Sequence, residues 1–392
     1  MTEGELELRR HLARTLLSDV DTLTGRVVSD ICVHSPVYAS GRPVALSDLR
    51  AICRDNLVLA LEEFGGLPVS VGDFTTAATE TGRRRARQGM PLDTVLMAYR
   101  RGGRVLWQAM TEPLRGRPAA EQDLGLEVAG ALWETIDRFS TVMSDAYCLA
   151  QLELNHRQNS RRGALFEALL EGRGSDPAIS AAAATALGVP VRDRFAVVVI
   201  AQDPSAPPAP ESALQAVGLW SFWRPRGERY AGIVRLGPAE PAELTAVLRG
   251  EVVGTAGISP PFQELAHADT ALRLAERSLR TLWPGSKEVA ELDDRLVEAV
   301  LTGDPEITDR LFARYLNRIH DCGSDSPVLL ETLRIWLDTG GSASRTAEQL
   351  YCHRNTILNR MTRISELTGW SMDSGEARLG WALALRAARL PR

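Results

Sequence analysis

Lysine is nearly absent from this sequence of 392 residues, since Lys287 is the only lysine among 45 basic residues. Acidic residues outnumber the basic ones, and the formal net charge is −5. A protein that coats nucleic acid in bulk needs a general excess of positive charge. That class of function is therefore excluded, and any contact with nucleic acid has to come from a local basic surface.

Cysteine and long apolar stretches are also scarce. The five cysteines show neither a CxxC pair nor any other paired spacing; they are Cys32, Cys53, Cys148, Cys322 and Cys352. We therefore expect no disulfide framework and no metal site. There is no run of 18 apolar residues and no signal-like N-terminal stretch. We expect no membrane contact and a cytoplasmic location.

Common catalytic motifs are missing as well. The sequence contains no Gly-x-Ser-x-Gly, no Walker-type loop, no His-x-x-x-His pair and no dinucleotide fingerprint. We expect that the protein is not an enzyme and needs no cofactor.

The most informative segment that is present covers residues 342–364, which read as two helices joined by a tight turn. Ala347 precedes Ile357 by ten residues, the spacing at which a small residue of a first helix packs against a branched residue of a second. A helix-turn-helix places its second helix in the DNA major groove. The alternative is a helical hairpin in an ordinary bundle. The short turn at 351–353 and the lack of Glu/Lys pairs on the outer face favour the DNA-binding interpretation.

A helical wheel divides the second helix into two faces. Met361 and Ile364 fall on the same side as Ile357, whereas Asn355, Asn359 and Arg363 form a row on the opposite side; this is the arrangement of an amphipathic helix. Asn pairs bidentately with adenine and Arg with guanine, at roughly 1–3 kcal/mol of discrimination each. The row therefore predicts contacts with base edges, and His353 is the predicted N-cap.

Three spaced motifs make this region specific: Glu331-Thr-Leu-Arg-Ile-Trp-Leu-Asp-Thr-Gly-Gly341, His353-Arg-Asn-Thr-Ile357 and Arg363-Ile-Ser-Glu-Leu-Thr-Gly369. Together they resemble the C-terminal domain of PucR/CdaR-type bacterial transcription regulators over about residues 327–390. The resemblance implies that the His-Arg-Asn-Thr run enters the groove first. The predicted DNA-binding set is Arg345, His353, Arg354, Asn355, Thr356, Asn359, Arg360 and Arg363. Family members often carry basic or aromatic residues at positions 358 and 359, so the Leu358-Asn359 pair suggests a different target sequence.

The surrounding helices of this region fit the same picture. We expect a first helix that starts at Pro327 and ends at Gly340-Gly341, and a final helix from Gly375 to about Leu390. Asp373 and Glu376 are predicted to form a capping-box pair before the final helix. From residue 327 to the end there are nine arginines, no lysine and six acids, a formal charge of +3. The positive charge is therefore local.

The middle of the chain predicts a sheet. A buried strand at 194–201 is followed by a Pro-rich loop at 203–210, and the expected order is βαββαβ with a closing helix at 262–282. This order favours one antiparallel sheet with helices on one face. The segment also resembles the degenerate cyclase-like (GGDEF-like) domain of the same family.

A nucleotide cyclase requires acidic residues that hold two metals and a Gly-Gly hairpin that admits the nucleotide. Here the hairpin 224–230 keeps one glycine and one acid and adds three arginines, and Asp203 lies in the Pro-rich loop. We expect ligand binding or dimerisation in place of catalysis.

The first 150 residues predict helices at 3–17, 46–64, 74–88 and 91–110, followed by a long helical stretch from about 121 to 170. Residues 90–107 resemble the helical sensor domain of some PucR-type proteins and of RsbR-type stressosome proteins. We expect the basic run 83–87 to be a solvated helix face. Tyr99, Arg100 and Trp107 are candidates for a ligand pocket, although core packing is the stronger expectation for each. The end of the long helix could pair with its copy in a dimer.

These observations predict a multidomain α and α+β protein. It comprises an all-α N-terminal bundle (1–150), a connecting helix (151–185), a βαββαβ cyclase-like domain (186–285), a helical linker (286–326) and a C-terminal all-α helix-turn-helix domain (327–392). The expected function is a sequence-specific transcriptional regulator that binds double-stranded promoter DNA as a homo-oligomer and responds to an unidentified small-molecule effector. The alternative is a signalling scaffold that binds protein or nucleotide partners without DNA.

Overall fold

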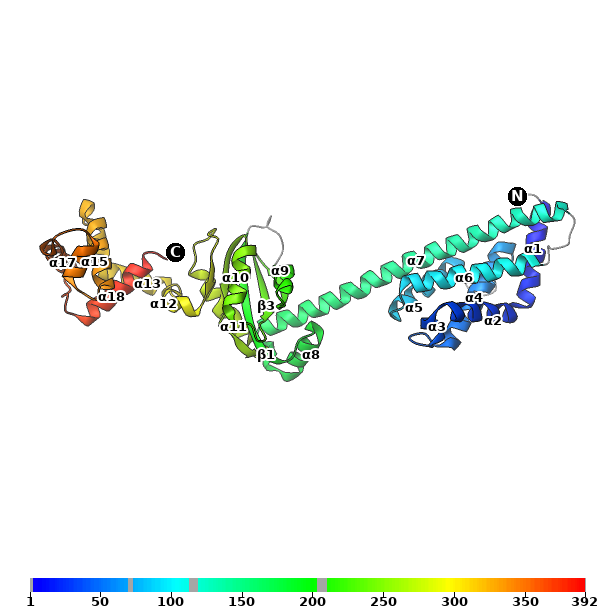
Figure 1. Cartoon of the computed structure of the whole chain (residues 1–392), viewed down its shortest axis with the longest axis horizontal. Coiled ribbons are helices and arrows are strands. Elements are labelled where there is room, and N and C mark those ends of the chain that lie inside the picture. The colour runs from blue at the N-terminus through cyan, green and yellow to red at the C-terminus, as the bar shows by residue number, and fades with distance from the viewer. Residues whose placement is uncertain (1–2, 70–72, 113–118, 203–209, 392) are drawn as a thin grey trace. The chain divides into compact units, whose positions relative to one another are not determined.

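The computed structural model describes residues 3–69, 73–112, 119–202 and 210–391. The chain divides into two compact units, Met1–Ser160 and Arg161–Arg392. One continuous helix, α7 (Ala119–Leu170), belongs to both (Figure 1). The first unit is helical, and the second contains a mixed sheet followed by a helical domain. The predicted multidomain α and α+β fold class is therefore confirmed. Among the described residues, no helix is both long enough and apolar enough to cross a bilayer.

The N-terminal unit packs its helices around a single apolar core. Its helices are α1 (Glu3–Ser18), α2 (Val20–His34), α3 (Pro36–Ala39), α4 (Leu46–Gly65), α5 (Phe74–Arg87), α6 (Leu92–Thr111) and the first part of α7. Helix α2 was not predicted. Its many β-branched residues lower helix propensity, but Leu23, Val27 and Ile31 form a buried stripe that packing stabilises.

The basic run in α5 differs from the prediction of a solvated face. Arg85 is only 2% exposed, and its Nη1 donates hydrogen bonds to Asp48 (3.0 Å) and Gln88 (2.7 Å). Arg84 pairs with the same Asp48 carboxylate, and Arg87 lies 3.8 Å from Glu80. Arg84 and Arg85 therefore connect α5 to α4 through Asp48. A buried guanidinium such as that of Arg85 needs charged or polar partners of this kind.

The sheet of the second unit contains six strands: β1 (Arg192–Gln202), β2 (Trp220–Arg226), β3 (Arg229–Arg235), β4 (Gly254–Ile258), β5 (Phe262–Glu264) and β6 (Val289–Glu291). Their order is β2-β3-β1-β4-β6, and β5 also pairs with β1. All pairs are antiparallel except β4 and β6, which are parallel. The prediction of one antiparallel sheet is therefore wrong. Phe262 begins a strand and not the predicted helix.

Helices cover both faces of this sheet, which corrects the prediction of helices on one face. They are α8 (Pro177–Leu187), α9 (Glu211–Ala216), α10 (Pro241–Glu251) and α11 (Ala268–Arg280). Phe195, Val197 and Val199 of β1 pack in one core with α8, α11 and the end of α7. Ala196, Val198 and Ile200 pack in a second core with α9 and α10. A continuous apolar strand needs cover on both sides, and that explains the two layers.

The segment predicted as a helical linker begins with strand β6, and Lys287 is exposed just before it. Three helices follow, α12 (Leu296–Leu301), α13 (Pro305–Tyr315) and α14 (Asn317–His320). Tyr315, Leu316 and Ile319 are buried in the core of the C-terminal helical domain. The remaining helices of that domain are α15 (Ser326–Asp338), α16 (Ala343–Gln349), α17 (Arg354–Thr368) and α18 (Gly375–Ala387). Short 3₁₀ turns occur at 173–175, 265–267, 293–295 and 323–325.

Candidate DNA-binding interface

Helices α16 and α17 form the predicted hairpin. Ala347 and Ile357 are buried in the same core cluster, as their ten-residue spacing predicted. Met361 and Ile364 extend this buried face along α17, and Trp336 of α15 lies in the same cluster. The supporting helix therefore holds α17 by its apolar side and leaves the opposite side to solvent.

The turn between the two helices depends on Tyr351, whose φ is 48°; it is the only described residue other than glycine with a positive φ. Its amide donates to the Glu348 carbonyl (3.3 Å), and the Cys352 amide donates to the Ala347 carbonyl (3.0 Å). These two bonds are the Schellman pattern that ends a helix through a left-handed residue. Tyr351 is 96% exposed, so its ring projects from the turn beside the start of α17.

Sequence reasoning missed Tyr351, because a glycine or asparagine is the usual signal for a left-handed position. A tyrosine there costs about 1–2 kcal/mol in backbone strain. Strained, exposed residues often mark functional sites.

His353 caps the N-terminus of α17, as predicted. Its Nδ1 accepts a hydrogen bond from the Asn355 amide (3.2 Å). In this geometry the neutral ring carries its proton on Nε2, which is then a donor. The first turn of a helix also presents free amides and a partial positive charge, and both favour an anion such as a phosphate.

The outer face of α17 matches the predicted wheel. Asn355, Asn359 and Arg363 are all exposed, whereas the face with Ile357 is buried. Arg363 lies 3.4 Å from Glu366, and both side chains are exposed. The face contains no Glu/Lys pair, as expected, but it does contain this Arg/Glu pair. An exposed pair of this kind is worth less than about 1 kcal/mol and leaves Arg363 free to exchange partners.

The other predicted residues divide into two groups. Arg345 of α16 and Arg354 of α17 are exposed, and within the described parts of the chain neither makes an ion pair. Thr356 and Arg360 are half-buried. Arg360 donates from Nη1 to the Thr332 hydroxyl of α15 (3.2 Å), and that hydroxyl donates to the Val328 carbonyl (2.7 Å). Arg360 therefore joins α17 to α15, and its cation also contributes to the local positive potential.

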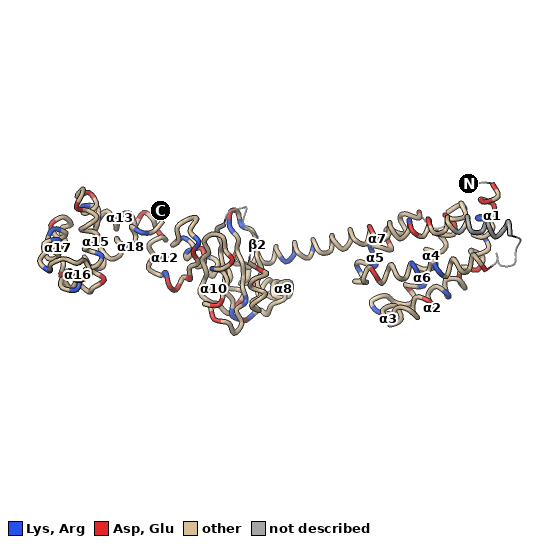
Figure 2. Tube along the Cα trace, turned by 45° about the horizontal axis from the view of Figure 1, so that its top comes forward, with Lys and Arg blue, Asp and Glu red and all other residues tan. Residues whose placement is uncertain are grey.

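Several charged groups near the hairpin are engaged within the domain. Arg334 pairs with both Glu331 and Asp338 on α15. The hydrogen bonds from Arg334 are the main reason that the pKa of Glu331 lies below its ordinary value. Arg378 stacks on the Trp336 ring at 5.0 Å. The basic positions along α16 and α17 appear in Figure 2.

The cap of the final helix differs from the prediction. The Ser374 hydroxyl accepts from the Ala377 amide (3.2 Å), so Ser374 is the N-cap of α18. The predicted capping box of Asp373 and Glu376 is wrong, because Asp373 lies one residue too early. Glu376 instead accepts a hydrogen bond from the Tyr315 hydroxyl (3.4 Å).

The sheet domain contains the predicted hairpin 224–230. The β2–β3 hairpin turns at Gly227 (φ 60°), and Arg226 lies 3.0 Å from Glu167 of α7. Asp203 and most of the Pro-rich loop lie outside the described residues. Within the described chain, no group of three or more His, Cys, Asp or Glu residues could hold a metal ion.

A cavity of about 90 Å³ lies inside the N-terminal unit. Of the three residues suggested by the sequence, Tyr99 lines it, whereas Arg100 and Trp107 do not.

Three family models match successive parts of the chain. The RsbT co-antagonist protein rsbRD N-terminal domain matches residues 21–162, the GGDEF-like domain matches residues 171–281, and the PucR C-terminal helix-turn-helix domain matches residues 329–387.

Individual relatives are similar over shorter stretches. An uncharacterized protein of Mycobacterium tuberculosis is 29% identical over 113 residues, which are 29% of this chain and 27% of that protein. The purine catabolism regulatory protein of Bacillus subtilis is 44% identical over 62 residues, which are 16% of this chain and 12% of that protein. The chain thus spans about a quarter or less of the length of these relatives.

Among solved structures, a regulator of polyketide synthase expression from Bifidobacterium adolescentis covers 58% of this chain and 96% of its own, at 24% identity and a TM-score of 0.30. The three family models match the chain one after another, and these matches identify its domains. The chain therefore contains an RsbRD-type helical domain, a GGDEF-like domain and a PucR C-terminal helix-turn-helix domain, and its predicted resemblance to PucR-type regulators is confirmed.

Proposed function

We propose that this protein is a sequence-specific, DNA-binding transcriptional regulator that acts in the cytoplasm. The observation that carries the proposal is the division of α17 into a buried face and an exposed row of Asn355, Asn359 and Arg363. Amide and guanidinium groups are the side chains that read adenine and guanine in the major groove. The neighbouring His353 cap and Arg354 would meet the phosphate backbone at the helix N-terminus.

Loss of base contacts provides the test. We expect the double variant Asn355→Ala and Asn359→Ala to lose preference for the selected operator over random DNA, by roughly 1–3 kcal/mol for each lost bidentate pair. Asn317→Ala is the matched control, because Asn317 is an exposed asparagine of the same domain outside the hairpin. Operators would be selected from genomic fragments and affinities measured by fluorescence anisotropy. Unchanged operator preference in a folded double variant would refute the assignment.

A signalling scaffold without DNA contact makes a different prediction. A DNA-binding protein releases counterions from phosphates, so its affinity falls steeply with salt. A scaffold shows no salt-dependent DNA affinity at all. Titration of the full chain with duplex DNA at several salt concentrations separates the two.

We further propose that the protein binds DNA as a homodimer. One helix-turn-helix module buries little DNA, whereas two modules reach half-sites about 34 Å apart. Leu149 and Leu152 on α7 are 62% and 64% exposed, and they offer apolar surface to a second copy of the helix. We expect Leu149→Glu with Leu152→Glu to shift the molar mass measured by light scattering from dimer to monomer. If the protein without these substitutions is a monomer, the proposed dimer is contradicted.

The remaining domains would control the activity of the DNA-binding domain. We propose that the N-terminal and GGDEF-like domains respond to a small molecule or to assembly, and that the GGDEF-like domain has no cyclase activity. Three arginines replace most of the catalytic features in its hairpin. Incubation of the protein with magnesium and nucleoside triphosphates should yield no cyclic or linear dinucleotide product.

A further inference from the structure

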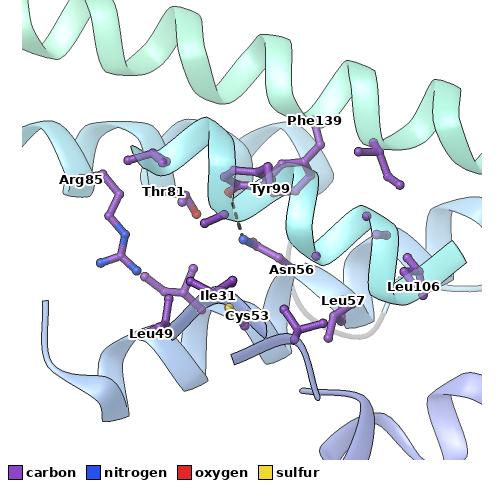
Figure 3. A pocket seen from close by; sticks show the side chains of 18 of the residues that line it. Ile31, Leu49, Cys53, Asn56, Leu57, Thr81, Arg85, Tyr99, Leu106 and Phe139 are labelled. Carbon is purple, nitrogen blue, oxygen red and sulfur yellow. Dashed lines mark hydrogen bonds between the residues drawn. The ribbon is translucent and has the colours of Figure 1, made fainter. Parts of the chain in front are cut away.

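The cavity in the N-terminal unit lies among α2, α3, α4, α5, α6 and α7. Most of its wall is aliphatic or aromatic, and Figure 3 shows Ile31, Leu49, Leu57, Leu106 and Phe139 around it. Protein interiors usually pack without voids larger than a water molecule. A cavity of about 90 Å³ inside this core is therefore larger than ordinary packing leaves, and it has room for a small ligand.

One glycine helps to keep this space open. Gly102 lies in the interior of α6, where glycine weakens a helix relative to alanine. A Cβ added at Gly102 would meet only the Val27 side chain, at an ordinary contact distance of 3.6 Å. Close helix packing therefore does not require this glycine. It differs from the adjacent Gly103, where a Cβ would come within 3.2 Å of Ile136.

The hydroxyls of Thr81 and Thr135 in the cavity wall donate to carbonyls of their own helices, and other polar groups reach the cavity at two places. Asn56 of α4 donates a hydrogen bond from Nδ2 to the Tyr99 hydroxyl of α6 (3.1 Å), as the dashed line in Figure 3 shows. Burial raises the pKa of Tyr99 above its ordinary value, so this phenol stays protonated. The Asn56–Tyr99 pair is therefore a neutral hydrogen-bonding group in an apolar wall.

The second polar place is cationic. The almost fully buried Arg85 lines the cavity from α5, and its guanidinium lies 6.0 Å from the centre of the Tyr38 ring. Arg84 and Arg85 both pair with the single carboxylate of Asp48, so these three side chains together carry a net charge of +1. Buried cations favour an anion within reach.

Tyr38 and Cys53 complete the chemistry of this end. Burial raises the pKa of the Tyr38 phenol to about 12, so its hydroxyl remains a hydrogen-bond donor. Burial likewise raises the pKa of the Cys53 thiol to about 12, which keeps that group neutral. A ligand at this end therefore meets one cation, one hydroxyl donor and no competing negative charge other than the shared carboxylate of Asp48.

We propose that this cavity binds a small monocarboxylic acid with a short hydrocarbon chain. Its carboxylate lies against the Arg85 guanidinium and the Tyr38 hydroxyl, and its chain fills the apolar space towards Leu106 and Phe139. A cavity of about 150 Å³ accommodates benzene, so the smaller space here suits a chain of about four or five carbons. Guanidinium groups bind carboxylates through charge-assisted hydrogen bonds. The role of this acid as the effector rests on the proposed regulatory function, whereas its binding does not.

Direct binding to the full-length protein tests the site. The probe is sodium isovalerate, and the comparison compounds are isoamyl alcohol, which has the same branched chain without the charge, and sodium octanoate, which is too long. We expect isovalerate to bind saturably in isothermal titration calorimetry and to raise the thermal midpoint of the N-terminal unit. Isoamyl alcohol and octanoate should bind at least about tenfold more weakly. Equal binding of the acid and the alcohol, or no binding of isovalerate, overturns the proposal.

A cavity-filling variant locates the ligand. Gly102→Val introduces three carbons into the space, and we expect it to weaken isovalerate binding at least about tenfold while the helical content is kept. Gly130→Val is the matched control, because Gly130 is a helical glycine with open space around its added Cβ. If Gly102→Val does not fold, Gly102→Ala gives the same comparison with a smaller loss. Unchanged binding in the folded variant shows that the acid binds elsewhere and refutes this site.

The proposed acid-binding site and the proposed regulatory function can be refuted independently of each other. Isovalerate binding that leaves operator affinity unchanged in anisotropy contradicts the effector role and keeps the site. Operator binding without any isovalerate binding contradicts the site and keeps the regulator.

Discussion

Arg360 of α17 donates a hydrogen bond to the Thr332 hydroxyl of α15, over 3.2 Å. The bond joins the side of the recognition helix to the helix that supports it. Thr332 is fully buried, so the bond is formed away from bulk water. The bond restrains the rotation of α17 about its own axis, and that rotation decides which side chains of α17 are exposed.

Removal of the Thr332 hydroxyl should leave α17 less firmly held against α15, because the hydrogen bond from Arg360 is lost. We expect Thr332→Val to lower the free energy of unfolding of the C-terminal domain by about 1 kcal/mol and to weaken operator binding several-fold, without a change in the ranking of operator sequences. Urea denaturation and anisotropy measure the two effects. Thr302→Val is the control, since the Thr302 hydroxyl bonds only to carbonyls of its own helix. A changed ranking of operators would show that Arg360 itself reads bases.

Substitution of Tyr351 by glycine and by alanine should change the free energy of unfolding differently. Tyr351→Gly relieves about 1–2 kcal/mol of left-handed strain but adds freedom to the unfolded chain worth about 0.4–1 kcal/mol. We therefore expect a net gain of about 0.5–1 kcal/mol in the free energy of unfolding. Tyr351→Ala keeps the strain and should show no gain. Equal stabilities of the two variants would mean that the turn is unstrained.

Arg345 should contribute to binding without regard to sequence. Loss of one phosphate contact lowers the slope of log affinity against log salt by about 0.9. We expect Arg345→Ala to show this change equally on operator and random duplexes. The exposed Arg318 of α14 provides the control, because Arg318→Ala removes the same charge outside the hairpin. A loss confined to the operator would make Arg345 a base reader.

Acid should destabilise the N-terminal unit through Asp48. Burial alone would raise the pKa of Asp48, but hydrogen bonds from Gln88 and Arg85 hold the pKa below its ordinary value. The carboxylate therefore contributes its full stabilisation above its unfolded pKa of about 3.9, and that contribution is lost as the pH falls through the lower folded value. We expect Asp48→Asn to lower the thermal midpoint at neutral pH and to flatten its decline below about pH 4.

The exposed ion pair of Asp21 and Arg54 offers the matched control for this measurement. Asp21→Asn should change neither the midpoint nor its dependence on pH by a comparable amount. Similar curves for the two variants would show that Asp48 is no more coupled to folding than a surface carboxylate.

The cysteines should differ in reactivity. Burial raises the pKa of Cys53 to about 12, so almost no thiolate is present at neutral pH. Cys148 is exposed on α7. We expect iodoacetamide to alkylate Cys148 at least tenfold faster than Cys53 in the folded protein, and at a similar rate in urea, as followed by mass spectrometry. Rapid labelling of Cys53 under native conditions would mean that the cavity wall opens.

The sequence predicted the helical hairpin well because its signals are local and periodic. The spacing of Ala347 and Ile357 and the two-sided wheel of α17 follow from helix geometry alone. Tyr351 could not be predicted, since the left-handed turn is set by the bonds that end α16 and not by the residue type. The DNA-binding role of the eight predicted residues stays a prediction.

Long-range pairing explains most of the errors elsewhere. Strand β6 has only three residues, too few for a pattern, and it becomes a strand because it lies beside β4. Phe262 reads as the start of a helix until its pairing with Phe195 of β1 is known. Arg85 reads as a surface charge, because only the fold brings Asp48 to it. The cavity likewise forms only when the six helices that line it pack together.

The short edge strand β6 has a practical consequence, because the exposed Lys287 stands two residues before it and is the only lysine side chain. An amine-directed fluorophore can therefore modify only one side chain, which lies next to this edge of the sheet, and the α-amino group is its other target. Detachment of the strand would change the emission of such a dye, so that the contact between the sheet and the segment leading to the helix-turn-helix domain becomes observable in real time.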